Sequence, residues 1–252
     1  MGRQSGVRGA VVAVALVLGV GGCAGSGTSE NGKANGKPEA KPPASTTPST
    51  ASSPAPSGAN GNPPSGDVLP GMVAVAVART QLAALPVAKP GTMAGYSRDK
   101  FTHWAEQGDK CDTREVVLKR DGAEVGRDAE CRAVSGRWKS LYDGAEIDEA
   151  AKLDIDHMVP LAEAWRSGAA GWDAAKRKAF ANDLTRPQLL AVSASSNRSK
   201  GDQSPDLWQP TDRSSWCLYG RAWTTVKSQY GLTVTEAERT KLTVMLDTCA
   251  AS

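Results

Sequence analysis

The chain has 252 residues, of which 40% are hydrophobic and 23% are charged, and its formal net charge is +3. Because Arg3 and Arg8 near the N-terminus contribute two of these charges, the remainder is nearly neutral and gives no overall indication of a nucleic-acid partner. Two histidines and five cysteines without a CxxC pair are too few ligands for a histidine-rich or thiolate zinc site.

The first 22 residues have the features of a secretory signal. Two arginines precede an apolar run at residues 9–20. This run is shorter than the stretch of about 20 apolar residues that a transmembrane helix needs, and its length is typical of a signal peptide. The letters "VGGC" at residues 20–23 resemble a bacterial lipobox, and this resemblance implies cleavage before Cys23 and lipidation of that residue. An ordinary signal peptide followed by a chance cysteine is the alternative. We expect a signal peptide at residues 1–22 and an extracytoplasmic lipoprotein anchored to the outer face of the cell membrane.

A segment rich in Gly, Ser, Pro, Thr, Asn and Ala follows at residues 23–67. Residues 23–66 contain no Val, Ile, Leu, Met or aromatic side chain. Such a segment cannot bury enough apolar surface to offset the entropy of ordering it, so we expect a disordered tether. The remaining residues, 68–252, contain all seven tryptophans and have the size of one domain.

The first half of this domain shows helix and turn signals. Residues 72–87 are Ala-rich and predict an opening helix, and a second helix is predicted to begin within residues 95–104, with Ser97 as its N-cap. Two Asp-Gly dipeptides each separate two short segments of β character. They predict β-hairpins over residues 114–126 and 136–147.

The second half alternates strands and helices before it becomes helical. The letters "LDIDHMV" predict a strand that stops at Pro160, "LAEAWRSGA" and "DAAKRKAFAND" predict helices, and "QLLAV" predicts a short apolar strand. The letters "SASSNRSKGD" predict a strand that runs into a helix ended by Gly201. Residues 215–231 predict a helix with Gly231 as C-cap, and the final helix opens with a capping box at Thr235.

Four cysteines remain in the domain, and an even number in an exported chain predicts two disulfides. The sequence allows three pairings. We favour Cys111–Cys131 and Cys217–Cys249, because each pair encloses a compact local unit and the second would join the last two helices.

The stretch "LDIDHMVPL" contains His157, directly preceded by Asp156. A Ser-His-Asp hydrolase would need a GxSxG elbow and a nucleotide-binding loop would need GxxxxGK[ST], and neither motif is present. One histidine, hard oxygen ligands and nearby basic residues suit hydrolysis of phosphodiesters, in which a neutral imidazole deprotonates water and a divalent cation stabilises the phosphate.

Two longer stretches carry a family resemblance. "DIDHMVPLAEAW" at residues 154–165 and "ANDLTRPQLLAVSASSNRSKGD" at residues 181–202 resemble the HNH endonucleases of the ββα-metal fold. The wider frame, which covers most of residues 95–249, resembles secreted bacterial HNH-type proteins related to the C-terminal domain of GmrSD-type restriction enzymes. The resemblance implies an α+β fold: a ββα-metal (HNH) nuclease core with flanking helices and β-hairpins.

The resemblance also implies roles for individual residues. His157 matches the general base, and Asp156 and Asn197 match ligands of a divalent cation, which we expect to be Mg²⁺, with Mn²⁺ as the alternative. Asn182 matches the middle asparagine of the family's catalytic set, which ties its loop to the strand that bears the histidine. Many HNH proteins have a third acidic or histidine ligand near the last asparagine. Serines occupy those positions here, so several waters, or a carboxylate such as Asp154 or Glu163, would complete the coordination.

Several basic residues are candidates for phosphate contacts. The resemblance assigns this role to Arg198 and Lys200. For Arg98 and Arg114, a loop anchor and a phosphate contact are equally good interpretations. His103 is expected to be structural. One geometric difficulty also remains: strict strand alternation would put the adjacent residues Asp156 and His157 on opposite faces unless the strand ends or twists there.

The sequence therefore predicts a monomeric, metal-dependent endonuclease, tethered to the cell surface, that hydrolyses DNA with little sequence specificity. The alternatives are a non-catalytic nucleic-acid-binding lipoprotein that retains the fold and a purely structural lipoprotein of the cell envelope.

Overall fold

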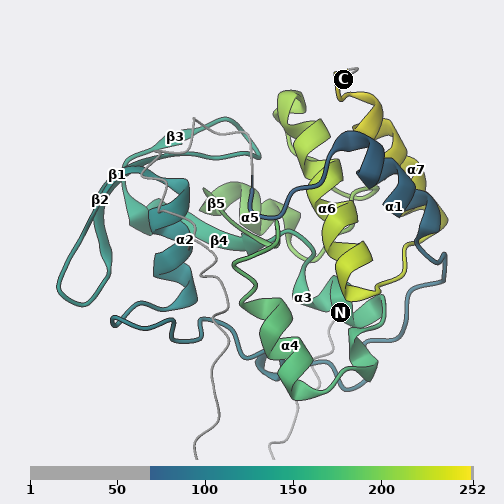
Figure 1. Cartoon of the computed structure of the whole chain (residues 1–252), viewed down its shortest axis with the longest axis horizontal. Helices are drawn as coiled ribbons and strands as arrows, with labels where there is room; N and C mark the ends of the chain where they lie inside the picture. The colour runs from purple at the N-terminus through teal and green to yellow at the C-terminus, as the bar shows by residue number, and fades with distance from the viewer. Residues whose placement is uncertain (1–68, 251–252) are drawn as a thin grey trace, which may run out of the picture. The chain divides into compact units, whose positions relative to one another are not determined.

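The computed structural model describes residues 69–250, which are drawn in colour in Figure 1. The predictions of a signal peptide at residues 1–22, of a lipidated Cys23 and of a tether at residues 23–67 lie outside the described residues. Within residues 69–250, no helix is both long enough and apolar enough to span a membrane.

Two small antiparallel sheets and seven α-helices make up the described part of the chain, which confirms the predicted α+β class. The first sheet has the order β1 (Ala123–Arg127), β2 (Ala133–Lys139), β3 (Glu146–Ile147), and the second pairs β4 (Leu153–His157) with β5 (Leu189–Ser193). The helices are α1 (Val75–Ala84), α2 (Thr113–Asp121), α3 (Leu161–Arg166), α4 (Ala174–Ala181), α5 (Ala194–Lys200), α6 (Trp216–Tyr230) and α7 (Glu236–Asp247).

Strands β4 and β5 together with helix α5 form a ββα unit. The two strands pair from Leu153–Ser193 to His157–Leu189, and α5 begins directly after β5, with the Ser193 hydroxyl accepting a hydrogen bond from the amide of Ser196. Alternate residues of the strands face different cores. Leu153 and its same-face neighbours pack with α2, whereas Leu190 and Val192 belong to the main core. The unit predicted from the family resemblance is therefore present.

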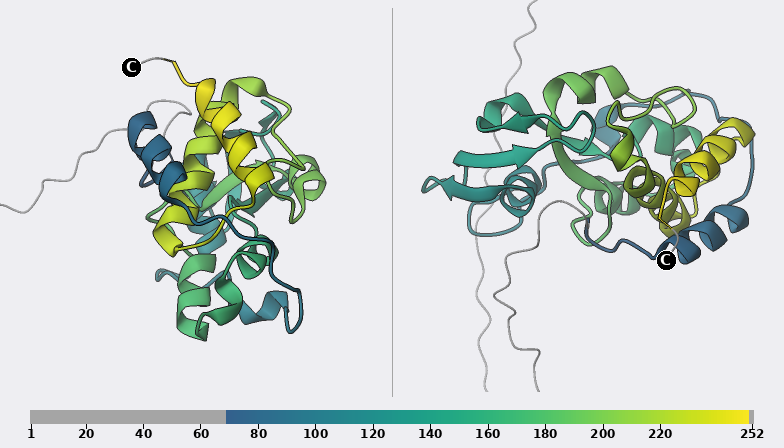
Figure 2. Two further views of the ribbon diagram at one scale, coloured as in Figure 1. Left: turned by 90° about the vertical axis from the view of Figure 1, so that its right-hand side faces the viewer. Right: turned by 90° about the horizontal axis from the view of Figure 1, so that it is seen from above.

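Helices α1, α6 and α7 lie side by side and cover the main core (Figures 1 and 2). The fully buried side chains of Tyr219 and Trp223 on α6 pack with Leu242 and Leu246 on α7. Helix α6 ends at Gly231 in the left-handed conformation, and α7 begins with the predicted capping box at Thr235. These helix ends were predictable because they depend on local residues.

The predicted hairpin over residues 114–126 is wrong. The segment forms helix α2, which begins at the N-cap Asp112, whose side chain accepts a hydrogen bond from the amide of Glu115. Gly122 ends the helix instead of turning a hairpin, and a side chain there would collide with the indole of Trp138. The helix predicted within residues 95–104 is likewise reduced to a 3₁₀ turn at Arg98–Lys100, although its predicted cap, Ser97, is in place. The hairpin of β2 and β3 is confirmed.

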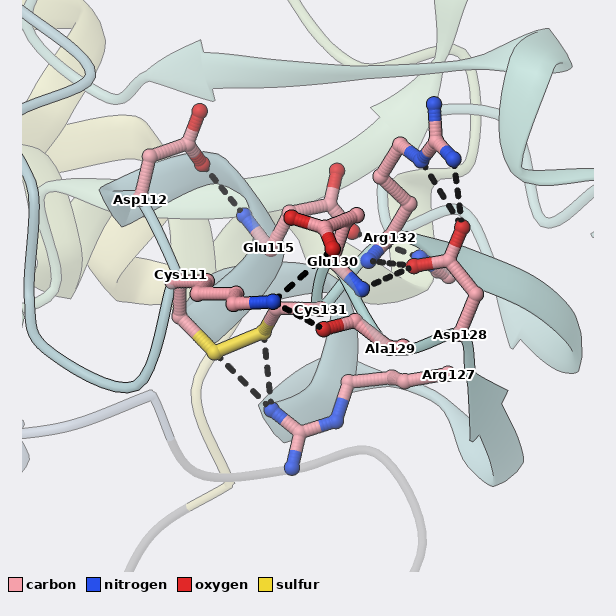
Figure 3. Close-up of a disulfide and its surroundings, with 11 residues drawn as sticks. Cys111, Asp112, Glu115, Arg127, Asp128, Ala129, Glu130, Cys131 and Arg132 are labelled. Carbon is pink, nitrogen blue, oxygen red and sulfur yellow. Dashed lines mark hydrogen bonds and ion pairs between the residues drawn. A yellow bond between two sulfur atoms is a disulfide. The ribbon is translucent and has the colours of Figure 1, made fainter.

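Both predicted disulfides are confirmed. Cys111–Cys131 joins the loop before α2 to the turn between β1 and β2, and Figure 3 shows the Arg127 guanidinium beside both sulfur atoms, at 3.2 and 3.1 Å. Cys217–Cys249 joins the beginning of α6 to the residues that follow α7. Each disulfide fixes a contact between elements that are separate in the sequence.

We expect replacement of both Cys217 and Cys249 by serine to lower the free energy of unfolding by about 3 kcal/mol, because the bond closes a long loop in the unfolded chain. Urea denaturation of the oxidised protein and the double variant measures this difference. An unchanged denaturation midpoint would contradict the expectation.

Candidate active site

A cavity of about 190 Å³ lies at the end of strand β4, and we call it the β4 cavity. Its lining includes Asp156 and His157 from β4 and Asn197 from α5. These three residues are the predicted metal ligands and the predicted base. The side chains of these adjacent residues follow the alternation of the strand, because Asp156 contacts Tyr142 of the main core whereas His157 stacks on Trp104 of the second core. Both residues line the cavity because it lies where β4 ends, at His157. Arg98 and Asp202 also line the cavity.

His157 is buried, with 4% of its surface exposed, and its ring is held by a backbone carbonyl. Its Nε2 lies 3.0 Å from the carbonyl oxygen of Ala181, so Nε2 carries the proton and Nδ1 is the unprotonated nitrogen. Burial lowers the pKa of His157 from 6.5 to about 3. The imidazole is therefore neutral at neutral pH, which is the form that a general base requires.

Two aromatic rings from the loop before α2 surround His157. The indole of Trp104 is stacked on the imidazole with ring centroids 5.8 Å apart, and the ring of His103 lies edge-on at 6.5 Å. His103 Nδ1 lies 2.9 Å from the carbonyl oxygen of Phe101, a contact that fits its expected structural role. The chain thus brings its two histidines together although 54 positions separate them.

Asn182 acts on His157 through the backbone. Its Oδ1 accepts hydrogen bonds from the amide of Ala105 and the hydroxyl of Thr113, both at 2.8 Å. Its Nδ2 donates to the carbonyls of Thr102 and Lys178, at 2.7 and 2.8 Å. These four bonds fix the end of α4, where the Ala181 carbonyl contacts His157. Asn182 was predicted as part of the catalytic set, but it does not line the cavity. It therefore acts by positioning His157 rather than by contact with a substrate.

Asp156 forms a buried ion pair with Lys200. The Lys200 ammonium lies 2.7 Å from Oδ2 of Asp156 and 2.9 Å from the His157 carbonyl oxygen, and the Tyr142 hydroxyl donates to the same Oδ2. The prediction that Lys200 contacts phosphate does not fit this position, because Lys200 is completely buried. It lies one helical turn after Asn197 on α5, and its side chain ends under β4, where it neutralises the carboxylate.

Burial determines the ionisation of this cluster. It raises the pKa of the Asp156 carboxyl, an effect that Lys200 opposes, and it lowers the pKa of Lys200, an effect that Asp156 opposes. Burial and the nearby Asp156 together hold the pKa of the Tyr142 hydroxyl well above its ordinary value. Tyr142 therefore stays protonated and serves as a hydrogen-bond donor to Asp156.

The donor set of the cavity fits a hard divalent cation. Tyr142 and Lys200 both contact Oδ2 of Asp156, which leaves Oδ1 for a ligand. Asn197 donates from Nδ2 to Oδ2 of Asp154 at 3.1 Å, which leaves the Asn197 amide oxygen. Within residues 69–250, no group of three or more His, Cys, Asp or Glu side chains could hold a metal ion. Two oxygen ligands completed by water are the arrangement that Mg²⁺ accepts.

The alternative third ligands have other contacts. Both carboxylate oxygens of Glu163 are engaged, one with Lys227 at 2.9 Å and the other with Arg166 at 3.0 Å. Glu163 is thus part of the buried core and is unavailable to a cation in the β4 cavity. Asp154 orients Asn197 by accepting its amide hydrogen.

The basic residues have different environments. Arg114 donates to the carbonyls of Ala150 and Leu153, which makes it a loop anchor. Arg198 is exposed on α5, and Arg98 is exposed at the β4 cavity.

Sequence reasoning did not identify Tyr142, Arg166 or Asp202 as parts of the site. Arg166 holds Asp202 at the cavity through an ion pair of 2.6 Å. The "LYDG" and "NRSKGD" stretches contain two of these residues, but their contacts depend on the tertiary fold.

Comparisons with known proteins match most of the domain. A family model for the C-terminal domain of GmrSD restriction endonucleases matches residues 112–245. An "Uncharacterized secreted protein" of Arthroderma benhamiae is 51% identical over 180 residues, which cover 71% of this chain and 88% of that protein. No solved structure matches the chain. The family match includes the predicted base and both predicted metal ligands.

We expect Lys200→Met to lower the free energy of unfolding by about 3–5 kcal/mol, because Asp156 would remain buried without its cation. The control is Arg198→Ala on the exposed side of α5, which should change it by no more than about 0.5 kcal/mol. Urea denaturation measures both. Equal, small losses would show that Lys200 is not the interior partner of Asp156.

The buried histidine predicts an acid-dependent loss of stability. The unfolded imidazole takes up a proton near pH 6.5, whereas the folded one does so only near pH 3. Because the unfolded state binds the proton more tightly, the free energy of unfolding should fall as the pH drops below 6.5, by up to about 1.4 kcal/mol per pH unit. Denaturation of the wild type and of His157→Gln between pH 7.5 and pH 4 isolates this contribution. Parallel pH profiles would contradict it.

Proposed function

The chain belongs to the family of GmrSD restriction endonuclease C-terminal domains, which is a nuclease-related family, and from this we propose that it is an exported, metal-dependent DNA endonuclease. The observation that carries the proposal is the β4 cavity, which is lined by a buried neutral imidazole and by two side chains with hard oxygen atoms, Asp156 and Asn197. Metal-dependent hydrolysis of a phosphodiester can use a base and a cation site of this kind together.

His157 is the proposed general base. With Nε2 donating to the Ala181 carbonyl, Nδ1 can accept a proton from a water molecule as its oxygen attacks phosphorus. The bond from phosphorus to one ester oxygen then breaks, and that oxygen leaves with a proton from solvent. The imidazole returns its proton to water, and Asn182 keeps the Ala181 carbonyl in place throughout.

Asp156 and Asn197 are the proposed ligands of Mg²⁺ or, alternatively, Mn²⁺. Such a cation, when bound, supplies positive charge that stabilises the phosphate and the departing oxygen. Lys200 and Tyr142 hold the Asp156 carboxylate in one orientation, and Asp154 does the same for Asn197. The protein's contribution is therefore an oriented pair of oxygen ligands.

The proposed substrate is DNA, bound through its backbone with little sequence specificity. Phosphate contacts position a protein on DNA without reading its sequence, and the exposed Arg198 on α5 is one candidate for such a contact. Helix α5 is only seven residues long and begins immediately after β5, which makes it a poor candidate for insertion into the major groove. We propose that the protein acts as a monomer.

The proposed location is outside the cytoplasm. The relative from Arthroderma benhamiae is described as secreted, and two disulfides are typical of proteins that fold in oxidising compartments. Lipidation at Cys23, which would anchor the protein to the membrane surface, remains part of this proposal.

Purified protein with intact disulfides should nick supercoiled plasmid in Mg²⁺ or Mn²⁺, and a chelator should stop the reaction. His157→Ala should lose at least about 10²-fold in rate, because general bases contribute about 10²–10⁴-fold. Gel electrophoresis of the plasmid measures nicking. A folded protein that cleaves no DNA with either metal would refute the DNA endonuclease and would favour a non-catalytic binding or structural role.

A further inference from the structure

Arg98 is a charged residue of the β4 cavity that has no part in the mechanism above. Its side chain is exposed, and it lines the same cavity as His157, Asp156 and Asn197. This arginine shares a cavity with the predicted base, which makes it a candidate for contact with the substrate.

The backbone around Arg98 is anchored on both sides. The amide of Asp99 donates to the Ser97 hydroxyl at 3.3 Å, and the amide of Phe101 donates to the Arg98 carbonyl at 3.0 Å. Phe101 is fully buried, and Tyr96 packs edge-on against Trp165 with ring centroids 5.7 Å apart. The turn that carries Arg98 is thus fixed in the core, while the side chain extends from it.

The guanidinium of Arg98 has no partner within residues 69–250. It forms no ion pair or hydrogen bond there, whereas the guanidinium groups of Arg114 and Arg166 are occupied by carbonyl or carboxylate oxygens. A structural anchor would show such contacts. Arg98 is exposed and lines the cavity without any such contact within the described residues.

The two carboxylates that line the cavity form ion pairs with other cations and none with Arg98. Asp156 is paired with Lys200 at 2.7 Å, and Asp202 is paired with Arg166 at 2.6 Å. Arg98 is therefore the charged residue of the cavity lining that has no ion-pair partner within residues 69–250. Its guanidinium is available to an anion that enters the cavity.

We propose that Arg98 binds the phosphodiester group of the substrate in the β4 cavity. A guanidinium can donate two parallel hydrogen bonds to phosphate oxygens, which fixes the orientation of the phosphate as well as its position. Arg98 would hold the phosphate beside Nδ1 of His157 and the oxygens of Asp156 and Asn197. This inference rests on the proposed nuclease function and names its substrate-binding residue, distinct from the exposed Arg198 and the buried Lys200.

The test compares Arg98→Ala and Arg98→Lys with a matched control, Arg137→Ala. Arg137 is also an exposed arginine, but it lies on β2 and pairs with Glu124 at 2.8 Å. Arg98→Ala should reduce kcat/KM for plasmid cleavage by about 10²–10³-fold, the usual cost of removing one donor to a reacting oxyanion. Arg98→Lys keeps the charge without the paired donors and should give a smaller loss, and Arg137→Ala should stay within about twofold of the wild type. Thermal melting should be unchanged in all three variants, because each of these side chains is exposed.

A binding measurement separates this inference from the proposed function. In a His157→Ala background with chelator present, affinity for a fluorescent DNA duplex should fall by about 10-fold or more with Arg98→Ala, and inorganic phosphate should compete less well with DNA. If the wild type does not cleave DNA but Arg98 still controls phosphate binding, the endonuclease is refuted and the phosphate site stands. If the wild type cleaves DNA and Arg98→Ala matches Arg137→Ala in both assays, the role of Arg98 is refuted and the endonuclease stands.

Discussion

The buried ion pair of Asp156 and Lys200 is the constraint on which the site depends. A charge in the protein interior is costly unless it is paired, so α5 must pack where its last residue reaches the carboxylate on β4. The same packing places Asn197, one turn earlier on α5, at the cavity. Tyr142 completes the cluster by donating to Asp156. One electrostatic requirement thus sets the geometry between the strand and the helix that carry the two proposed metal ligands.

A second set of hydrogen bonds, on the other side of β4, positions the imidazole of His157. Four hydrogen bonds of Asn182 fix the end of α4, and the Ala181 carbonyl then selects the tautomer of His157. The loop held by Asn182 also carries Trp104, which stacks on the imidazole. The two sets of contacts meet at the backbone of His157, where Lys200 donates to the carbonyl oxygen, so Lys200 links the proposed metal ligand to the proposed base.

Features with local causes were predictable from the sequence, and features with tertiary causes were not. The capping box at Thr235 and both disulfides were predicted from local motifs and spacing, whereas the ββα unit was predicted from the family resemblance. Helix α2 was missed because an Asp-Gly dipeptide suits a hairpin as well as a helix end, and the cap at Asp112 decides between them. The burial of Lys200 was missed because its partners lie 44 and 58 positions away in the sequence, on β4 and beside β2.

The ion pair between Asp156 and Lys200 affects how strongly the proposed metal site would bind a cation. The positive charge of Lys200 offsets the negative charge of Asp156, and Asn197 is neutral. These two proposed ligands would therefore attract a divalent cation less strongly than two unpaired carboxylates would. Mg²⁺ sites of this kind take further ligands from substrate phosphates. A phosphodiester held by Arg98 would supply those oxygens. We therefore expect cation and DNA to bind cooperatively: each would raise the affinity of the cavity for the other, and by linkage the two effects would be equal.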